Sequence, residues 1–360
     1  MVKHFLFNPN GRITHCFYYA CYYVKIYKHM FLCEHKKYTK RGNRMNPFPY
    51  SLDNKRYHTF NYHVKQKYGT KVAKICLNAS FTCPNRDGTK GYGGCIFCSS
   101  KGSGDFAGDS SQSLLTQFES QVQKIHKKWP NCKYIAYFQA NTNTYGTLDQ
   151  IKSCIDPFIH KEGVVAIAIA TRADCLSPEI IEYLISLQKH VDVWIELGLQ
   201  TIHNQTATFI NRGHTYEEFL EGLSALQKAN LNVCVHIINS LPYETKEMML
   251  ATIKKISQLD IQAIKIHMLY ICHHTTIASL YQKSPFTLLS RKQYIDLVVE
   301  QLSYLPPHII IERVTGDGDS TDLIAPLWSL NKTTILNDID KAMVAKNYYQ
   351  GCQYQKMPLE

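Results

Sequence analysis

The sequence contains no long hydrophobic run. Its longest purely apolar stretch is Val164–Ala170, whereas a membrane-spanning helix needs roughly 20 apolar residues, so we predict no membrane segment. Internal repeats and low-complexity linkers are also missing. Apolar residues make up 45% of the 360-residue chain and charged residues 19%. This composition is ordinary for a globular fold and excludes a disordered, collagen-like or coiled-coil chain. The length suits one large domain or two medium ones.

Cysteine is frequent, with 13 residues, but far less dense than in a small disulfide scaffold. The odd count and the uneven spacing favour a reducing compartment, so we predict a cytoplasmic protein whose thiols bind metals or lie in the core. Four cysteines stand in or beside apolar runs and are predicted to be buried small hydrophobes: Cys132, Cys154, Cys175 and Cys234.

Most of the net charge of +11 belongs to the first 44 residues. Residues 1–44 contain nine Lys or Arg and one acid, Glu34, and so carry +8. They show no clear helical or strand period. They could be a targeting peptide, a nucleic-acid-binding arm, or sequence upstream of a true start at Met45. We favour the third interpretation, because a plausible domain opening begins at Met45.

From Met45 onward, short apolar or β-branched runs alternate with amphipathic stretches. The predicted strands are Val72–Leu77, Tyr134–Gln139, Val164–Ala170, Val193–Leu199, Val233–Ile238 and Ala263–Leu269. Helical patterns lie between them, with Ser177 and Thr215 as predicted N-caps. This alternation is typical of βα units on a parallel sheet. We therefore predict the α/β class, with a partial (β/α)6 TIM-like barrel over residues 45–270 and an α/β extension over residues 271–360 that covers its open side.

Three cysteines follow the first predicted strand, at the end of a barrel where chemistry takes place. The segment reads Cys83-Pro-Asn-Arg-Asp-Gly-Thr-Lys-Gly-Tyr-Gly-Gly-Cys95-Ile-Phe-Cys98, and its glycines allow tight turns around a bulky group. Structural zinc takes four ligands, and the fourth candidate, Cys76, lies inside a strand. A [4Fe–4S] cluster on three thiolates leaves one iron open to chelate S-adenosylmethionine (SAM), as a radical SAM enzyme requires. A zinc site remains the alternative.

These motifs, with others along the chain, resemble those of a known family. The chain from Met45 is similar to radical SAM proteins and, within them, to the bacterial YhcC/YtqA family, which is related to the radical SAM core of the Elongator catalytic subunit. The resembling segments are Cys83–Cys98, Tyr137–Tyr145, Ile195–Thr201, Asn211–Thr215, His236–Pro242, Lys265–His267, Arg313–Asp317 and Ala325–Lys332. The resemblance implies a [4Fe–4S] cluster and SAM as cofactors, with Cys83, Cys95 and Cys98 as the catalytic metal ligands.

A SAM pocket needs partners for adenine, ammonium, ribose and carboxylate. Phe97, directly before the last cysteine, is predicted to pack against the adenine. Gln139 and Asn141 stand where many family members have a Gly-Gly-Glu turn, and we predict that their amides accept from the ammonium; the alternative is an ordinary polar turn. Glu196 and Gln200 share one face of a strand. We predict that Glu196 binds the ribose hydroxyls, unless it has a structural partner in the barrel interior.

Arg212 resembles the arginine that pairs with the SAM carboxylate in related enzymes, where a bidentate fork fits. Arg172 is a second candidate, with a surface arginine as the alternative. His236 and Asn239 lie on or after the fifth strand and are predicted near the adenine. Five residues are predicted to face the substrate: His267, Tyr270, Arg313, Asp317 and Lys332.

Basic residues interleaved with aromatic ones point to RNA. Residues 55–74 contain six Lys or Arg, no acid and four Tyr or Phe, and Lys124–Lys133 holds a second basic group. Such patterns suit RNA phosphates and bases, although a solvated basic face gives the same pattern. The resemblance implies tRNA as substrate, with the wobble uridine side chain as a candidate position, and an electron donor such as flavodoxin or ferredoxin.

One feature departs from the Elongator subunit. The chain ends at residue 360, without room for an acetyltransferase domain, so we expect no acetyl-derived group by that route. Two alternatives remain open: a radical SAM enzyme that acts on a small metabolite, and a zinc-dependent RNA-binding module.

Overall fold

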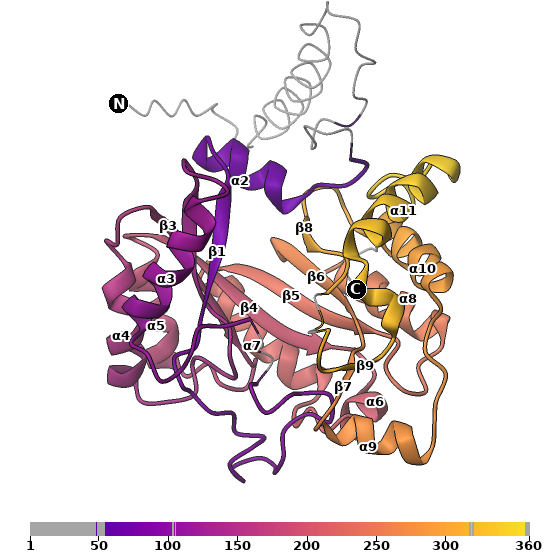
Figure 1. Cartoon of the computed structure of the whole chain (residues 1–360), viewed down its shortest axis with the longest axis horizontal. Coiled ribbons are helices and arrows are strands. Elements are labelled where there is room, and N and C mark those ends of the chain that lie inside the picture. Colours follow the sequence, from indigo (N-terminus) through magenta and orange to yellow (C-terminus); the bar gives the residue numbers. More distant parts are fainter. Residues whose placement is uncertain are drawn as a thin grey trace, which may run out of the picture. The chain divides into compact units, whose positions relative to one another are not determined.

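The fold is organised by a sheet of seven parallel strands. The computed structural model describes residues 48, 55–102, 104, 106–316, 318 and 320–356. The strands are β1 (Val72–Leu77), β2 (Lys133–Phe138), β3 (Val164–Thr171), β4 (Asp192–Gln200), β5 (Asn232–Asn239), β6 (Ala263–Met268) and β8 (Ile310–Arg313). They are hydrogen-bonded in chain order, and every neighbouring pair is parallel. The sheet curls into a partial barrel (Figure 1), and the loops after its strands therefore meet at one end.

Helices flank the strands along the chain, and several of them cover the outer face of the sheet. They are α2 (Phe60–Tyr68), α3 (Leu114–His126), α4 (Leu148–Ile155), α5 (Pro178–Leu187), α6 (Asn204–Phe209), α7 (Tyr216–Lys228), α8 (Lys246–Ile256), α9 (Thr276–Lys283), α10 (Arg291–Tyr304) and α11 (Lys332–Ala345). Ser177 caps α5 and Thr215 caps α7, as predicted, each by accepting from the N–H three residues on. A short antiparallel pair joins β7 (Ile271–Cys272) to β9 (Leu323–Ala325). Among the described helices, none has the length and apolarity to span a bilayer.

The two faces of the sheet bury different side chains. On β4, Val193, Ile195 and Leu197 belong to the main core between the sheet and the outer helices. Trp194 belongs to a second apolar cluster inside the curl, and Glu196 follows it on the inner face because side chains alternate along a strand. The inner face is therefore apolar towards the amino ends of the strands and polar further along.

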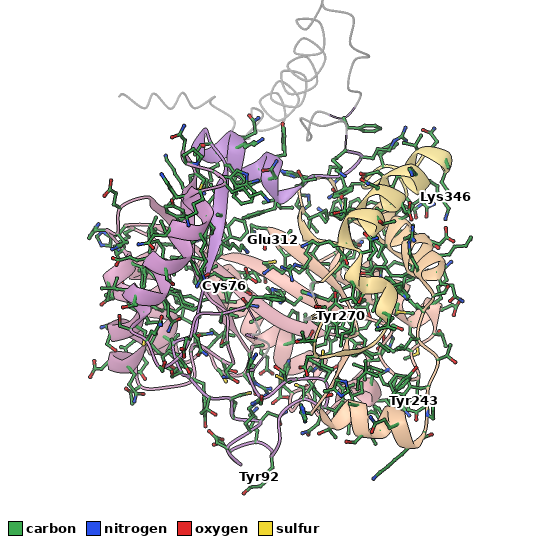
Figure 2. The ribbon with its side chains drawn as sticks, in the orientation of Figure 1. Cys76, Tyr92, Tyr243, Tyr270, Glu312 and Lys346 are labelled. Carbon is green, nitrogen blue, oxygen red and sulfur yellow. The ribbon has the colours of Figure 1, made fainter. Side chains whose placement is uncertain are left out.

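The sheet does not close, and β1 and β8 are its two edges. Cys76 of β1 and Glu312 of β8 lie on either side of this seam (Figure 2). A parallel bridge joins Thr59 to Ile311, whose N–H donates to the carbonyl of His58 (2.8 Å). The helix α2 follows directly and packs Val64 into the inner cluster. The amino-terminal part of the seam is thus covered by a segment for which the sequence predicted no element.

The predicted α/β partial barrel is confirmed. All six predicted strands form, with bounds that differ by one residue at most, and β8 adds a seventh from the segment that was expected only to cover the barrel. The boundary at residue 270 stays a prediction, and β8 from beyond it belongs to the same sheet. Residues 1–44, with their three interpretations, lie outside the described residues.

Candidate active site

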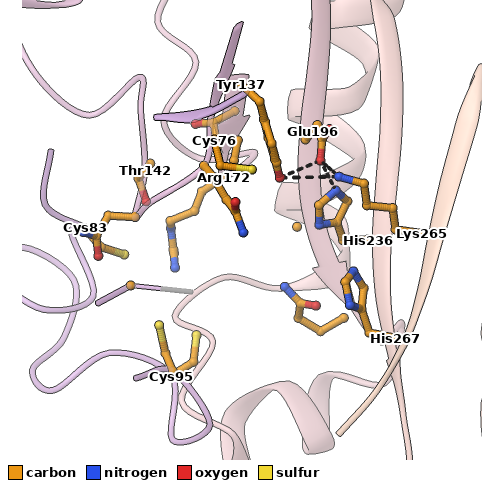
Figure 3. Close-up of a pocket in the computed structure, with 18 of the residues that line it drawn as sticks. Cys76, Cys83, Cys95, Tyr137, Thr142, Arg172, Glu196, His236, Lys265 and His267 are labelled. Atoms are coloured by element: carbon orange, nitrogen blue, oxygen red, sulfur yellow. Dashed lines mark hydrogen bonds and ion pairs between the residues drawn. The ribbon is translucent and has the colours of Figure 1, made fainter. Parts of the chain in front are cut away.

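A cavity of about 830 Å³ lies inside the curl of the sheet. All seven parallel strands contribute lining residues, either directly or through the loops that follow them, so the cavity depends on the fold of the whole sheet. Figure 3 shows Cys83 and Cys95 at one end of this space and a network of charged and polar side chains at the other. Because barrel enzymes hold their chemistry at the carboxyl ends of the strands, this cavity is the candidate active site.

The three predicted cluster ligands lie in the loop after β1. Tight turns shape the loop: the N–H of Arg86 donates to the carbonyl of Cys83 (2.8 Å), and the N–H of Cys98 donates to the carbonyl of Cys95 (2.9 Å). Gly94, with φ of 77°, adopts a conformation that side chains with a Cβ rarely take. All three cysteines line the cavity. The structure therefore brings together the thiols that the sequence singled out.

The cysteine loop is held by the segment that follows β4. The side chain of Asn85 donates to the carbonyl of Asn211, and the Asn211 amide donates back to the carbonyls of Tyr92 (3.2 Å) and Gly94 (2.8 Å). A Cβ at Gly213 would lie only 2.7 Å from Oδ1 of Asn85, so the close approach of the two segments requires glycine there. The cysteines are thus positioned by contacts outside their own loop.

The surroundings of the thiols fit an iron–sulfur cluster. The Arg86 guanidinium donates to Sγ of Cys98 (3.3 Å), and Nδ2 of Asn85 lies 4.0 Å from Sγ of Cys95. Hydrogen bonds to the sulfurs are one way in which proteins tune such a cluster. In the described part of the chain, no three His, Cys, Asp or Glu side chains converge on a single ion. Thiolates that each bind a different iron of a cube need not converge. When bound, a [4Fe–4S] cluster supplies the electron that cleaves SAM.

Residues predicted to contact the SAM ammonium and adenine also line the cavity. Gln139 and Asn141 follow β2, and Phe97 comes from the cysteine loop. Asn141 has φ of 58°, and its N–H donates to the carbonyl of Gly102 (2.9 Å). A Cβ at Gly102 would collide with the Asn141 amide, so the two segments touch at this point. The structure places these side chains in one cavity with the cysteines, and their individual contacts with SAM stay predictions.

The two candidate arginines are both buried and both engaged. Arg212 is 1% exposed, and its guanidinium donates to the backbone carbonyls of Leu199, Thr201 (2.6 Å) and His214 (2.9 Å). Its Nη2 is buried and has no hydrogen-bond partner among the described residues. A carboxylate could therefore reach one free donor of Arg212, not the bidentate fork that the sequence suggested.

The guanidinium of Arg172 already forms a bidentate ion pair within the protein. Its Nε and Nη2 donate to the two carboxylate oxygens of Asp174 (2.9 and 2.8 Å), and Nη1 donates to the carbonyl of Arg212 (2.7 Å). Burial alone would raise the pKa of Asp174, but the bidentate guanidinium lowers it to about 2. Arg172 is not the surface arginine that was the alternative; it fixes the backbone of Arg212.

Glu196 lies at the centre of a buried charge network. Its Oε1 accepts from Lys74 (2.5 Å), and its Oε2 accepts from Tyr137 (2.8 Å), His236 (2.7 Å) and Lys265. Figure 3 shows Tyr137, His236 and Lys265 pointing to this carboxylate from different strands. Burial would raise the pKa of Glu196, but the ammonium groups of Lys265 and Lys74 hold it well below its usual range.

The network continues to the seam, where Glu312 of β8 accepts from Lys74 (2.6 Å) and lies 3.4 Å from Lys265. Two lysines and two glutamates thus alternate inside the barrel. Gln200 lines the same cavity as Glu196, as their shared face predicted. Since both oxygens of Glu196 are occupied, a ribose hydroxyl would have to share them, and the ribose role stays a prediction.

Two histidines complete this wall. The ring centroids of His236 and His267 lie 5.6 Å apart. Burial and the ammonium group of Lys265 lower the pKa of His236, and burial with Arg313 holds the pKa of His267 well below its ordinary value. Both rings are therefore neutral near pH 7 and can accept a hydrogen bond from a ligand. Arg313, at the end of β8, also lines the cavity.

Three of the predicted residues that the structure describes do not line the cavity: Asn239, Tyr270 and Lys332. Asn239 is buried on the outer side of β5, where its amide pairs with Gln301 of α10 in two hydrogen bonds (2.8 and 2.9 Å). Tyr270 and Lys332 are not among the lining residues, and Asp317 lies outside the described residues. Of the cysteines predicted to be core residues, Cys132 and Cys234 are buried, whereas Cys154 and Cys175 are only partly so.

The sequence reasoning missed Lys74, Tyr137, Lys265 and Glu312. A usable signal was present. Lys74 stands inside the apolar run of β1, Lys265 inside β6, and Glu312 next to two isoleucines of β8. A charge within a strand that is buried on both faces needs a partner of opposite sign. Two positive and two negative charges of this kind could have been paired from the sequence.

Comparison with known proteins agrees with this site. Residues 80–256 match the radical SAM superfamily model, and residues 261–345 match the Radical_SAM C-terminal domain. Protein YtqA of Bacillus subtilis, which is uncharacterized, is 45% identical over 315 residues, covering 88% of this chain and 98% of that protein. The tRNA uridine(34) acetyltransferase of Methanocaldococcus jannaschii is 24% identical over 163 residues, covering 44% of this chain and 30% of that protein.

A solved structure shows the same fold. The archaeal Elp3 of Methanocaldococcus infernus, with its N-terminus deleted, superimposes with a TM-score of 0.59 at 18% identity, covering 78% of this chain and 64% of that one. The cavity, the cysteine loop and the partial barrel therefore belong to a radical SAM enzyme, whose cofactors are a [4Fe–4S] cluster and SAM. Within that superfamily, the chain belongs to the YhcC/YtqA family. The family and the cofactors that the motifs implied are confirmed.

Proposed function

We propose that this radical SAM enzyme modifies tRNA, with the wobble uridine as the target nucleotide and a flavodoxin or ferredoxin as the electron donor. The observation that carries the proposal is the shared ancestry of the barrel with proteins that act at this position. Two archaeal relatives bear the name tRNA uridine(34) acetyltransferase, and they are 24% identical to this chain over 163 and 167 residues. That likeness covers under half of this chain, so it supports the substrate class and not the reaction.

The cavity suits a substrate that carries polar groups. Beyond the predicted SAM residues, its wall presents the neutral imidazole of His267 and the guanidinium of Arg313. Lys74 and Lys265 are neutralised by Glu196 and Glu312, so the network itself is balanced. A nucleobase substituent with hydrogen-bond donors and acceptors would find partners of both kinds there.

The test is the nucleoside composition of tRNA. Bulk tRNA from a strain that lacks the gene is compared by mass spectrometry with tRNA from the parent, and from deletion strains that carry the wild-type or the Cys98→Ala gene. We expect one modified uridine to disappear in the deletion strain, to return with the wild-type gene and to stay absent with Cys98→Ala, which removes a cluster ligand. Four identical profiles would reject tRNA and favour a small metabolite as substrate.

A further inference from the structure

A group of lysines lies at the amino ends of β1 and β2, at the opposite end of these strands from the cysteine loop. We call it the lysine patch; it consists of Lys65, Lys71, Lys124, Lys127, Lys128 and Lys133. Lys71 directly precedes β1 and Lys133 opens β2, and the N–H of Lys133 donates to the carbonyl of Lys71 (3.0 Å). The two basic groups noted in the sequence, about 60 residues apart, thus meet on one surface.

The centre of the patch is a shared aromatic ring. Nζ of Lys71 lies 3.9 Å from the ring centroid of Trp129, and Nζ of Lys128 lies 4.9 Å from it. Cation–π contacts of this kind fix the position of an ammonium group. Partial burial, together with the positive charges of Lys65 and Lys128, lowers the pKa of Lys71. Like charges are therefore held close to one another here.

The patch has no acidic counterpart. In the part of the chain that the structure describes, none of its six lysines forms an ion pair, whereas the neighbouring Lys67 pairs with Asp192 (2.7 Å) and Lys161 pairs with Glu119 (2.7 Å). The other lysines of the same segments also form ion pairs within the protein: Lys55 pairs with Asp340, and Lys74 pairs with Glu196 and Glu312 in the cavity. An unbalanced cluster of positive charge attracts a polyanion.

We infer that the lysine patch binds the phosphate backbone of the tRNA at a distance from the nucleotide in the cavity; this rests on the proposed function. Six residues of β1 separate the patch from the cysteine loop, which is roughly 20 Å at about 3.3 Å a residue. A small metabolite cannot span that length, but a folded RNA can. Because Trp129 is already covered by two ammonium groups, the patch offers charge to phosphates and no free ring to bases, so its contacts position the RNA without reading sequence.

The experiment measures tRNA binding by the anaerobically prepared holoenzyme over a range of salt concentrations. The patch variant is Lys71→Ala/Lys128→Ala/Lys133→Ala. The matched control is Lys189→Ala/Lys228→Ala/Lys255→Ala, which removes the same charge from exposed lysines near the ends of α5, α7 and α8. We expect the patch variant to bind tRNA about tenfold to hundredfold more weakly. The slope of log Kd against log salt concentration should correspond to about two to three fewer phosphate contacts. Cleavage of SAM without RNA shows that each variant is folded.

The outcomes separate the two claims. If the wild type binds and modifies tRNA and the patch variant binds it equally well, the patch inference is wrong and the proposed function stands. If the control variant loses as much affinity as the patch variant, net charge explains the effect and the patch is again rejected. If the patch variant loses only reduction by flavodoxin, the surface serves the electron donor. If the wild type binds no tRNA, both claims fail.

Discussion

His214 is the residue whose titration most directly reports on the site. Both ring nitrogens are buried and have no hydrogen-bond partner among the described residues. Burial, with the adjacent guanidinium groups of Arg212 and Arg172, lowers the pKa of His214 to about 3. The imidazole is therefore neutral in the folded protein at any pH at which the enzyme works. A proton added here would place a third positive charge in one buried cluster.

This predicts acid sensitivity with a definite sign. In the unfolded chain His214 titrates near 6.5, so below that pH the unfolded state binds a proton that the folded state rejects. The free energy of unfolding therefore decreases as the pH falls from 6.5 towards 3, by up to about 1.4 kcal/mol per pH unit. The thermal midpoint of the holoenzyme is compared at pH 7 and pH 5, for the wild type and for His214→Gln. We expect a smaller drop in the variant, and an equal drop would show that His214 already carries a proton when folded.

At the scale of single residues, the spacing of the sequence revealed the cysteine ligands but not the partners of the charged residues. Cys83, Cys95 and Cys98 lie within 16 residues, and their chemistry is legible without the fold. The partners of Glu196 come from positions 40 or more residues away, and only the register of the sheet brings them together. The ribose role of Glu196 was inferred from its own side chain alone, which is why the surrounding network was missed.

At the scale of elements, ion pairs join strands that the backbone leaves apart. β1 and β8 share no ladder, yet Lys74 of β1 contacts Glu312 of β8 (2.6 Å). Glu196 of β4 and Lys265 of β6 complete the alternation of charge. A buried pair of this kind is not a large net source of stability, but removing one member leaves an uncompensated charge.

We therefore predict that Lys74→Met destabilises the enzyme by about 3 kcal/mol or more. The double variant Lys74→Met/Glu312→Leu, which removes one charge of each sign, should recover part of that loss. Lys67→Met is the matched control, because Lys67 pairs with Asp192 at the surface and such a pair contributes about 1 kcal/mol or less. Unfolding midpoints measure all three. A Lys74 variant no weaker than the Lys67 control would contradict the buried network.

Elements with strong local patterns were predictable, and weak ones were not. The six barrel strands are runs of β-branched and apolar residues, and they form where expected. α2 is rich in Lys, His and Gln and buries only Val64, so it carries no amphipathic signal. Asn239 was placed near the adenine because it ends a strand. By the period of two it lies on the face opposite His236, and there it pairs with Gln301.

At the scale of the whole molecule, one sheet places different tasks at its two ends. The carboxyl ends of the strands carry the cysteine loop, and the amino ends of β1 and β2 carry the lysine patch. The cavity runs inside the curl, where the network of Lys74, Glu196, Lys265 and Glu312 lines its wall. Sequence pattern predicted the barrel because βα alternation is local information. It could not place the patch, because that surface forms only when β1 and β2 pair.

The central claim is that three thiols on this barrel support reductive cleavage of SAM. Its most direct test is to give the anaerobically reconstituted enzyme SAM and dithionite and to quantify methionine and 5′-deoxyadenosine, with Cys98→Ala as the inactive control and Cys154→Ala, a cysteine of α4 away from the cavity, as the matched active one. We predict equal amounts of both products from the wild type and Cys154→Ala, and neither from Cys98→Ala. A wild-type enzyme that contains iron and sulfide yet yields no 5′-deoxyadenosine would contradict the account.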